Sequence, residues 1–261
     1  MIFYLGTHMP SWLRIAHVPL FVSRRRLTSK RLPRARCRWA LDSGAFSEIS
    51  LHGQWTITPQ QYAEEVRRYM TLIGRMDWAA TMDYMCEPHI LKKTGKTVQQ
   101  HQEMTIDNTL KLLALAPEVP WIPVIQGWKL DDYLRHVDQY GSRGLDLSLF
   151  PVVGVGSVCR RQRTAEGRKI LLGLADLKLR IHGFGVKLTG LLGITDRIAS
   201  ADSMAWSLEA RYSDPLPGHT HKNCANCFEY AMRWRARLLK RLKQATVEDN
   251  TLSVKLERSG T

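Results

Sequence analysis

Three aspartates, Asp42, Asp83 and Asp202, each come directly after a short apolar run of the kind that forms a buried strand. Taken singly, each has an ordinary explanation as a turn or helix cap, and the Ser-Gly pair after Asp42 is typical of a turn. A buried carboxylate otherwise needs a partner or a task. Three carboxylates at comparable positions predict acid–base or nucleophilic chemistry.

Other apolar runs also end in polar residues or glycines. Gln126 follows one run, Gly154 and Gly156 bracket the end of another, and His-Gly-Phe-Gly occupies 182–185. The C-terminal ends of the strands of an α/β barrel all lie on one face, and that face carries the active site. In such a barrel these residues and the three aspartates would form one polar ring.

A second group of chemically active residues lies late in the chain, where His219 and His221 precede the Cys-x-x-Cys of Cys224 and Cys227. Two imidazoles and two thiolates suit tetrahedral zinc. Prolines and a glycine precede the segment, which favours a metal-clamped loop over a redox pair at a helix start. Four protein ligands leave no position for a catalytic water, so we predict structural Zn²⁺. The cysteines are the firmer ligands, and a residue from elsewhere can replace one histidine.

The order of apolar and helical segments along the chain predicts a fold that brings the aspartates and the other polar strand ends together. Eight candidate strands alternate mostly with helical patterns, which favours a parallel sheet closed into a (β/α)8 TIM-like barrel. An open doubly wound sheet is the alternative, but no Gly-x-Gly-x-x-Gly motif follows the first strand. The candidate strands cover residues 2–5, 18–22, 38–41, 78–82, 121–125, 151–155, 179–184 and 198–201.

The clearest helix start lies at Thr58, which precedes Pro59 and Gln61. A capping Thr, a Pro at the first helical position and a Gln at the third satisfy the needs of a helix N-terminus. We expect this helix to end at Gly74, because glycine readily adopts the left-handed backbone of a helix C-terminus. Further amphipathic helices are expected over 98–115, 130–141 and from Thr164 onward.

We expect a single domain over 1–261 that consists of three consecutive parts. Residues 1–210 form the barrel, residues 211–245 form the zinc-binding loop and a basic helix, and residues 246–261 form a polar, loose tail. The chain has no repeat at a fixed solenoid period and no segment with the composition of a long linker. The polar ring and the metal site therefore belong to one folded unit.

The charge balance favours a polyanionic partner. Lys and Arg together number 38 and Asp and Glu 24, which gives a formal net charge of +14 at pH 7. Nucleic acid is the commonest polyanion that such an excess attracts. A solvated surface is the ordinary explanation of each basic segment, but phosphate binding is also plausible. The candidate phosphate contacts are Arg24, Arg25, Arg26, Arg233, Arg235 and Arg237.

The cysteines and the apolar runs exclude several classes of protein. Five scattered cysteines do not form the framework of a disulfide-rich secreted protein. The N-terminal segment is a poor signal peptide, and no uninterrupted apolar run is long enough to span a bilayer. We therefore expect a cytoplasmic protein without a membrane partner.

Several short motifs occur along the chain in a characteristic order. They are Asp-Ser-Gly-Ala-Phe at 42–46, Met-Asp-Tyr at 82–84, Val-Ile-Gln-Gly at 124–127, Gly-Phe-Gly-Val at 183–186, Asp-Ser-Met at 202–204 and the late Cys-x-x-Cys. This order resembles the tRNA-guanine transglycosylase superfamily. The compact length, the upstream histidines and Ala45 in place of a second glycine look more like its DNA-acting branch. That branch exchanges guanine for a 7-deazaguanine derivative in phage and bacterial DNA.

The resemblance implies a role for each site residue. Asp202 would be the nucleophile that attacks the sugar C1′ and forms a covalent glycosyl-enzyme, and Asp42 would be the general acid/base. Two such displacements retain the anomeric configuration. No redox cofactor or catalytic metal is implied. The implied base-binding residues are Asp83, Gln126, Gly154, Gly156, Phe184 and Gly185.

The implied partners are DNA and a free 7-deazaguanine base such as preQ0, in the cytoplasm of a bacterial or phage-infected cell. A homodimer and accessory modification proteins remain open. The same reaction on tRNA is the nearest alternative, and a non-enzymatic, zinc-stabilised nucleic-acid-binding protein is another. A metal-dependent barrel hydrolase is a third, although such enzymes place His-x-His after the first strand, whereas His219 and His221 come late.

Overall fold

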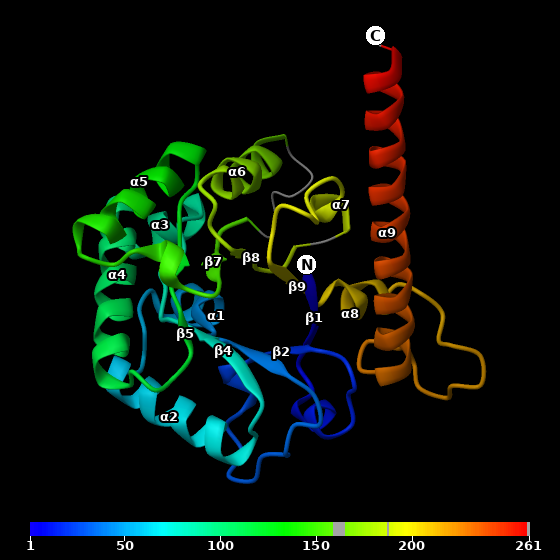
Figure 1. Cartoon of the computed structure of the whole chain (residues 1–261). Coiled ribbons are helices and arrows are strands. Elements are labelled where there is room, and N and C mark those ends of the chain that lie inside the picture. Colours follow the sequence, from blue (N-terminus) through cyan, green and yellow to red (C-terminus); the bar gives the residue numbers. More distant parts are fainter. Residues whose placement is uncertain (159–164, 187, 260–261) are drawn as a thin grey trace.

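Parallel strands form the centre of the computed structural model, which describes residues 1–158, 165–186 and 188–259. Within that part of the chain one nine-stranded sheet has the order β5-β4-β3-β2-β1-β9-β8-β7-β6, and every paired neighbour is parallel. Its two edge strands are consecutive in the sequence, so the sheet is a nearly closed barrel (Figure 1). The strands are β1 (Ile2–Thr7), β2 (Leu20–Ser23), β3 (Trp39–Asp42), β4 (Met76–Ala80), β5 (Trp121–Ile122), β6 (Val124–Ile125), β7 (Val153–Val155), β8 (Ile181–Gly183) and β9 (Ser200–Ser203).

The predicted α/β barrel is confirmed, with one change in the number of strands. The single strand expected over 121–125 is two strands, because Pro123 between them has no N–H to donate to a ladder. The strand expected over 78–82 runs instead from Met76 to Ala80, so Asp83 follows it after two irregular residues. The eight predicted strands all have counterparts in the barrel.

The helices surround the strands and follow the expected capping signals. Helix α2 (Pro59–Leu72) begins with a complete capping box, in which Gln61 N–H donates to Thr58 Oγ1 at 3.2 Å and Thr58 N–H donates to Gln61 Oε1 at 2.9 Å. Helix α4 occupies Val98–Leu115 as expected. Thr164, the expected start of a later helix, lies outside the described residues. The other helices are α1 (Ala45–His52), α3 (Pro88–Thr94), α5 (Leu130–Ser142), α6 (Ala165–Asp176), α7 (Leu188–Leu191), α8 (Ala205–Glu209), α9 (Phe228–Ser259) and the 3₁₀ turns η1 (Pro10–Arg14), η2 (Arg24–Arg26) and η3 (Leu147–Leu149).

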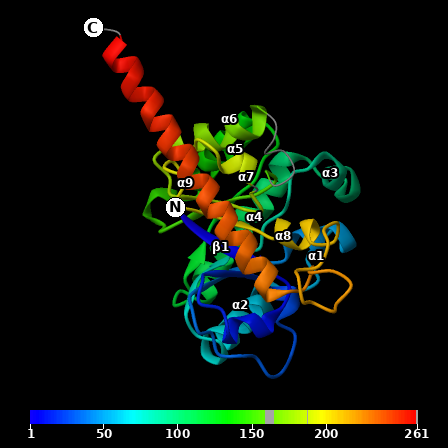
Figure 2. The ribbon, with the colours of Figure 1, turned by 90° about the vertical axis from the view of Figure 1, so that its right-hand side faces the viewer.

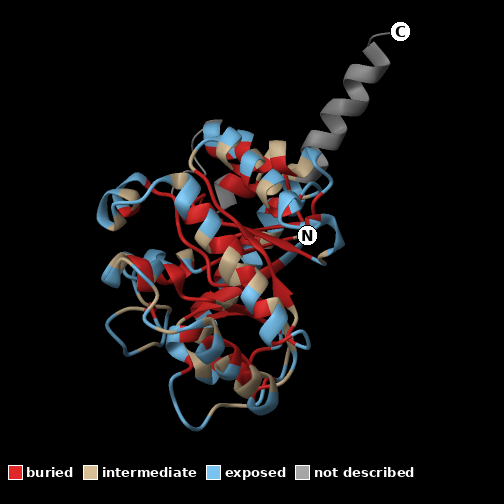
Figure 3. Ribbon diagram, turned by 90° about the vertical axis from the view of Figure 1, so that its left-hand side faces the viewer, coloured by how far each residue is buried: buried red, intermediate tan, exposed pale blue. Residues whose placement is uncertain are grey.

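The core has an inner and an outer layer, because successive residues of a strand point to opposite sides of a sheet. In β1, Tyr4 belongs to a small cluster with the side chains of neighbouring strands, whereas Leu5 packs in the larger cluster that includes the helices. Figure 3 shows the buried residues concentrated along the central strands. The inner cluster fills the barrel, so space for a ligand remains at its ends. Its members are Tyr4, Phe21, Ala40, Trp78, Ala80, Ile122, Val124 and Val152.

Helix α9 packs along the outside of the barrel beside β1 (Figures 1 and 2). The ring of Trp234 lies 6.2 Å from that of Phe3, and Leu238 and Leu242 are buried. The backbone of α9 is helical from Phe228 to Ser259, a stretch that contains neither glycine nor proline. The loose tail expected over 246–261 stays a prediction. Among the described helices, none is both long enough and apolar enough to cross a membrane.

Candidate active site and metal-ligand cluster

The three aspartates lie at the same end of the barrel. Asp42 is the last residue of β3, Asp202 lies in β9, and Asp83 follows β4. Asp42 and Asp202 line one cavity of about 510 Å³, and Asp42 and Asp83 line an adjoining cavity of about 190 Å³. The fold thus brings together carboxylates that are far apart in the sequence, as the polar ring at the strand ends requires.

One carboxylate oxygen of Asp202 is held from two sides. Its Oδ1 accepts a hydrogen bond of 2.8 Å from the Gly185 N–H and lies 3.3 Å from Nε2 of His182. Nδ1 of His182 lies 2.8 Å from Oγ of Ser200. Asp202 is only 5% exposed, and its second oxygen has no hydrogen-bond partner among the described residues. One oxygen of Asp202 is therefore held in a fixed position.

Strand register explains why His182 reaches Asp202. His182 of β8 is the direct neighbour of Ser200 in β9, and Asp202 stands two residues further along, on the same face of the strand. The imidazole is fully buried among the rings of Tyr4, Phe21, Trp78 and Phe184. This packing fixes the plane of the imidazole and hence the direction from which it meets the carboxylate.

Asp42 has an environment that favours its protonated form. Burial raises the pKa of Asp42 above its usual range, and the nearby negative charge of Asp202 acts in the same direction. The Gly44 N–H donates to Asp42 Oδ1 at 3.1 Å and opposes this shift. Gly44 has a φ of +83°, in the left-handed region that favours glycine. A carboxyl group that holds its proton beside an ionisable carboxylate suits general acid catalysis.

The smaller cavity contains a polar edge and apolar walls. Oδ1 of Asp83 accepts a hydrogen bond of 3.1 Å from Ser43, and Oδ2 accepts one of 2.5 Å from Nε2 of Gln126. Burial raises the pKa of Asp83 to about 7. The side chains of Phe21, Phe46 and Phe184 line the same space. A flat aromatic ring with hydrogen-bonding groups along one edge matches this combination.

The two predicted glycines of the base site have different surroundings. Gly156 lines the cavity, and a Cβ there would lie 2.1 Å from Nε2 of Gln126. Gly154 does not line it, because the ring of Phe184 occupies the space beside it, where a Cβ would lie 2.6 Å from that ring. A direct approach of Gly154 to the base stays a prediction, and its observed neighbour is the ring of Phe184. Both glycines make room for side chains that line the cavity, which are Gln126 and Phe184.

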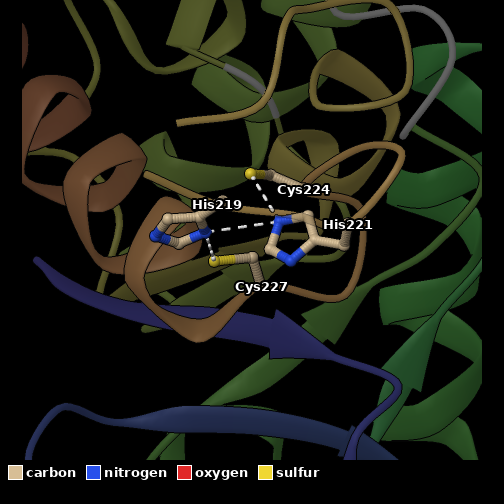
Figure 4. A group of neighbouring side chains, drawn as sticks. All are labelled: His219, His221, Cys224 and Cys227. Carbon is tan, nitrogen blue, oxygen red and sulfur yellow. Dashed lines mark hydrogen bonds between the residues drawn. The ribbon is translucent and has the colours of Figure 1, made fainter. Parts of the chain in front are cut away.

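The four predicted metal ligands form one cluster ahead of α9 (Figure 4). Their ligand atoms all lie within 4.8 Å of one another. His221 Nε2 lies 3.1 Å from Cys224 Sγ and 3.3 Å from His219 Nδ1. His219 Nδ1 in turn lies 3.7 Å from Cys227 Sγ. Zinc bonds of 2.0–2.3 Å place tetrahedral ligands about 3.3–3.8 Å apart. Both the ligand types and the spacing therefore fit a metal ion such as structural Zn²⁺.

The loop that carries the His/Cys cluster also contacts the end of the barrel where the three aspartates lie. Ser207 of α8 donates a hydrogen bond of 2.9 Å to the carbonyl of Ala225. His8, which lines the larger cavity, hydrogen-bonds through Nε2 to Asn226 and stacks on Trp206 with ring centroids 6.0 Å apart. The loop that carries the cysteines thus supports one wall of the cavity that contains Asp42 and Asp202.

Comparison with known proteins identifies the family. A family model described as DpdA, DeoxyPurine in DNA protein A, matches residues 1–258. The chain belongs to the DpdA family. DpdA is the DNA 7-deazaguanine transglycosylase and is related to the tRNA-guanine transglycosylase superfamily, which confirms the resemblance seen in the motifs. A search of curated proteins found no match.

Membership of the DpdA family makes DNA the expected substrate, so the arginines near the site are of interest. Arg24, predicted to bind nucleic acid, is buried instead and pairs with Glu48 at 2.7 Å and Glu65 at 3.1 Å. Its charge is neutralised within the protein, so the predicted phosphate contact does not fit. Arg25 pairs with Glu48 at 2.9 Å but lines the larger cavity, as does Arg26.

The three predicted arginines of α9 all have partners within the protein. Arg233 pairs with Glu229 at 2.5 Å, and Arg237 pairs with Glu209 at 3.0 Å. Arg235 is partly buried and donates to the backbone carbonyl of Phe3 at 3.3 Å. Arg235 therefore joins α9 to β1, whereas Arg233 and Arg237 keep exposed guanidinium groups on the helix surface.

Two histidines of the site were missed by the sequence analysis. The sequence pattern placed His182 only within the His-Gly-Phe-Gly segment at 182–185, and it did not single out His8. His182 carried a usable signal, because a histidine inside an apolar strand must find a hydrogen-bond partner when it is buried. The position of His182 in the sequence did not indicate that its partner would be Asp202. The position of His8 did not indicate that it would contact the loop that carries the cysteines.

Proposed function

We propose that the protein exchanges guanine in DNA for a 7-deazaguanine derivative through a covalent intermediate on Asp202. The observation that carries this proposal is the arrangement of the two carboxylates. Asp202 has one oxygen held by Gly185 and His182, and Asp42, with a raised pKa, lines the same cavity. A nucleophile and a neighbouring acid are what a two-step base exchange requires.

In the first step the free oxygen of Asp202 attacks C1′ of the target deoxyguanosine. The bond between C1′ and N9 breaks, and its electron pair leaves with guanine. Protonated Asp42 donates its proton to the departing base, which leaves as neutral guanine. His182 and the Gly185 N–H hold the carboxylate in a single orientation, so the nucleophile does not have to be ordered during the reaction.

In the second step the incoming base takes the place of guanine. The carboxylate of Asp42, now ionised, removes the N9 proton of that base, and N9 attacks C1′. The ester bond to Asp202 breaks, which regenerates both carboxyl groups in their starting protonation states. Each displacement inverts C1′, so the product retains the original configuration.

Asp83 and Gln126 are proposed to recognise the base. An ionised Asp83 can accept hydrogen bonds from N1–H and the exocyclic amine of guanine or of a 7-deazaguanine, while Gln126 meets the six-position oxygen. Phe184 and Phe46 supply apolar faces for the ring. We propose preQ0 as the incoming base, because a small substituent at position 7 leaves that hydrogen-bonding edge unchanged.

The His/Cys cluster is proposed to hold zinc that stabilises the loop before α9. His219, His221, Cys224 and Cys227 would be its ligands. Bound zinc would supply a fixed loop conformation and no chemistry at C1′. The residues that act on the nucleotide remain those of the barrel mouth.

A base-exchange assay tests the proposal. Purified protein is incubated with radiolabelled guanine and either guanine-containing DNA or tRNA, with the Asp202→Asn variant as the matched control. We expect label in DNA with the wild-type protein only, and a covalent protein–DNA adduct that depends on Asp202. Label in tRNA alone would overturn the choice of polymer, and equal label with Asp202→Asn would overturn the nucleophile.

A further inference from the structure

A groove of about 410 Å³ lies beside the catalytic cavity, between the segments that follow β1 and β2. Arg26 lines both the groove and the larger cavity, so the two spaces adjoin at this side chain. No acidic residue lines the groove. Its lining residues are Pro10, Ser11, Arg14, Arg26, Ser29, Arg31, Leu32 and Pro33.

The guanidinium groups of the groove differ from those of their neighbours. Arg14, Arg26 and Arg31 are exposed, and within the described residues none of their side chains has a hydrogen-bond or ion-pair partner. Arg24 and Arg25, by contrast, both pair with Glu48. The groove therefore presents positive charge that the protein itself does not neutralise, and such charge favours an anionic ligand.

The walls of the groove are tied together by hydrogen bonds. The Arg36 N–H donates to the carbonyl of Leu13 at 2.8 Å and joins the two segments. Nη2 of Arg68, from α2, donates to the carbonyls of Ser29 at 2.5 Å and Lys30 at 2.9 Å. Because these bonds fix the backbone, the groove exists before a ligand arrives, and binding need not order the loop.

We propose that this groove binds the backbone phosphates of the DNA strand next to the target nucleotide. The inference rests on the proposed function, which places the sugar C1′ at Asp202. A nucleotide bound there has its flanking phosphates at the mouth of the cavity, where Arg26 leads into the groove. Guanidinium groups bind phosphate oxygens through paired N–H donors, and the hydroxyls of Ser11 and Ser29 offer further donors.

Phosphate contacts position a protein on DNA without reading the sequence. The groove therefore contributes affinity and register, while the choice of base stays with the smaller cavity. Each phosphate contact releases condensed counterions, so binding through the groove depends steeply on salt.

The test is a salt titration of DNA binding with an Arg14→Gln, Arg31→Gln double variant. Arg26 is left in place because it also lines the catalytic cavity. Fluorescence anisotropy gives the Kd for a duplex of about 20 base pairs at several salt concentrations. We expect a higher Kd for the variant. The slope of log K against log salt should be less negative by about 2, because each lost phosphate contact reduces the magnitude of the slope by about 0.9.

Two control variants make the result specific. Lys169→Gln with Arg180→Gln removes the same charge from exposed positions on α6 and before β8, and we expect it to keep the wild-type slope. Arg14→Lys with Arg31→Lys keeps the charge, and we expect it to retain most of the slope. A slope unchanged in the glutamine variant, or reduced equally by the control, would overturn the proposal.

Binding and catalysis are measured separately, so the two proposals fail in different ways. If the wild-type protein exchanges no base but the glutamine variant alone loses salt-dependent DNA binding, the groove stands and the proposed chemistry fails. If exchange proceeds in both and binding is identical, the groove proposal fails. If the variant loses affinity for tRNA and not for DNA, the assigned polymer is wrong.

Discussion

The carboxylate site and the His/Cys cluster are built in opposite ways. Asp42, Asp83 and Asp202 come from strands or connections spread over most of the chain and meet only because the barrel closes. The four candidate metal ligands lie between His219 and Cys227, within one loop. The first site depends on the whole fold for its geometry, whereas the second depends on a short segment that is held in place. Losing a carboxylate should therefore remove chemistry and leave the fold, whereas losing a metal ligand should first lower the stability of the fold and reduce activity only through it.

The largest expected effect is on catalysis, in Asp202→Asn. We expect base exchange to fall by about 10³-fold or more, because the amide is a poor nucleophile. The zinc content and the thermal unfolding midpoint should stay close to those of the wild type, since the side chain keeps its shape. Initial rates, metal analysis and a thermal scan check this, and a variant that unfolds or loses zinc would contradict the contrast.

The converse expectation concerns Cys224→Ser. We expect loss of about one zinc per chain and a lower free energy of unfolding, by about 2 kcal/mol or more, because the bound metal stabilises only the folded loop. Activity should fall as well, through the contact between His8 and Asn226. Metal analysis and denaturant titration measure the two effects. A stability equal to that of the wild type would show that the cluster has no structural role.

Asp83→Asn should change how stability depends on pH. The pKa of Asp83 is raised to about 7 by burial, above the value of about 3.9 in an unfolded chain. The folded state therefore holds this proton more tightly, and stability declines as the pH rises from about 4 to about 7. The variant lacks this decline, so its stability relative to the wild type should rise by about 2 to 4 kcal/mol between pH 4 and pH 8. Denaturant titrations at several pH values measure the free energy of unfolding of both proteins. If the two free energies depend on pH in the same way, the expectation is wrong.

His182 offers a finer test of how the carboxylate site is assembled. We expect His182→Phe to lower kcat by about 10- to 100-fold with little change in KM for the free base, because the nucleophile loses its orientation while the base site is intact. His182→Gln keeps a side-chain donor and should recover part of the rate. If KM changes and kcat does not, His182 has a different role.

The smallest expected effect lies outside both regions, at the start of α2. Thr58→Ala removes the acceptor for the Gln61 N–H and should lower the free energy of unfolding by about 1 kcal/mol. Zinc content and the exchange rate should remain at wild-type values. A change in either would mean that a loss of general stability is enough to disturb the two sites, and would weaken the contrast between them.

Local patterns allowed much of the fold to be predicted. The capping residues at Thr58 and the helix over 98–115 were readable because caps and helical periodicity lie within a few neighbouring residues. The His/Cys cluster could be predicted for the same reason, since the spacing of its residues is local. The aspartates at the strand ends followed from the alternation of strands and helices, which implies a common face in a barrel.

Only the tertiary structure decided which of these groups meet. His182 reaches Asp202 because β8 and β9 pair in a register that places His182 beside Ser200, and no local pattern encodes that register. Arg24 is buried against Glu48 and Glu65 while Arg26 stays exposed, although both belong to the same run of arginines. Sequence determines the chemistry available at each position, but long-range packing determines the partner of each charge, and the partner decides what that charge can do.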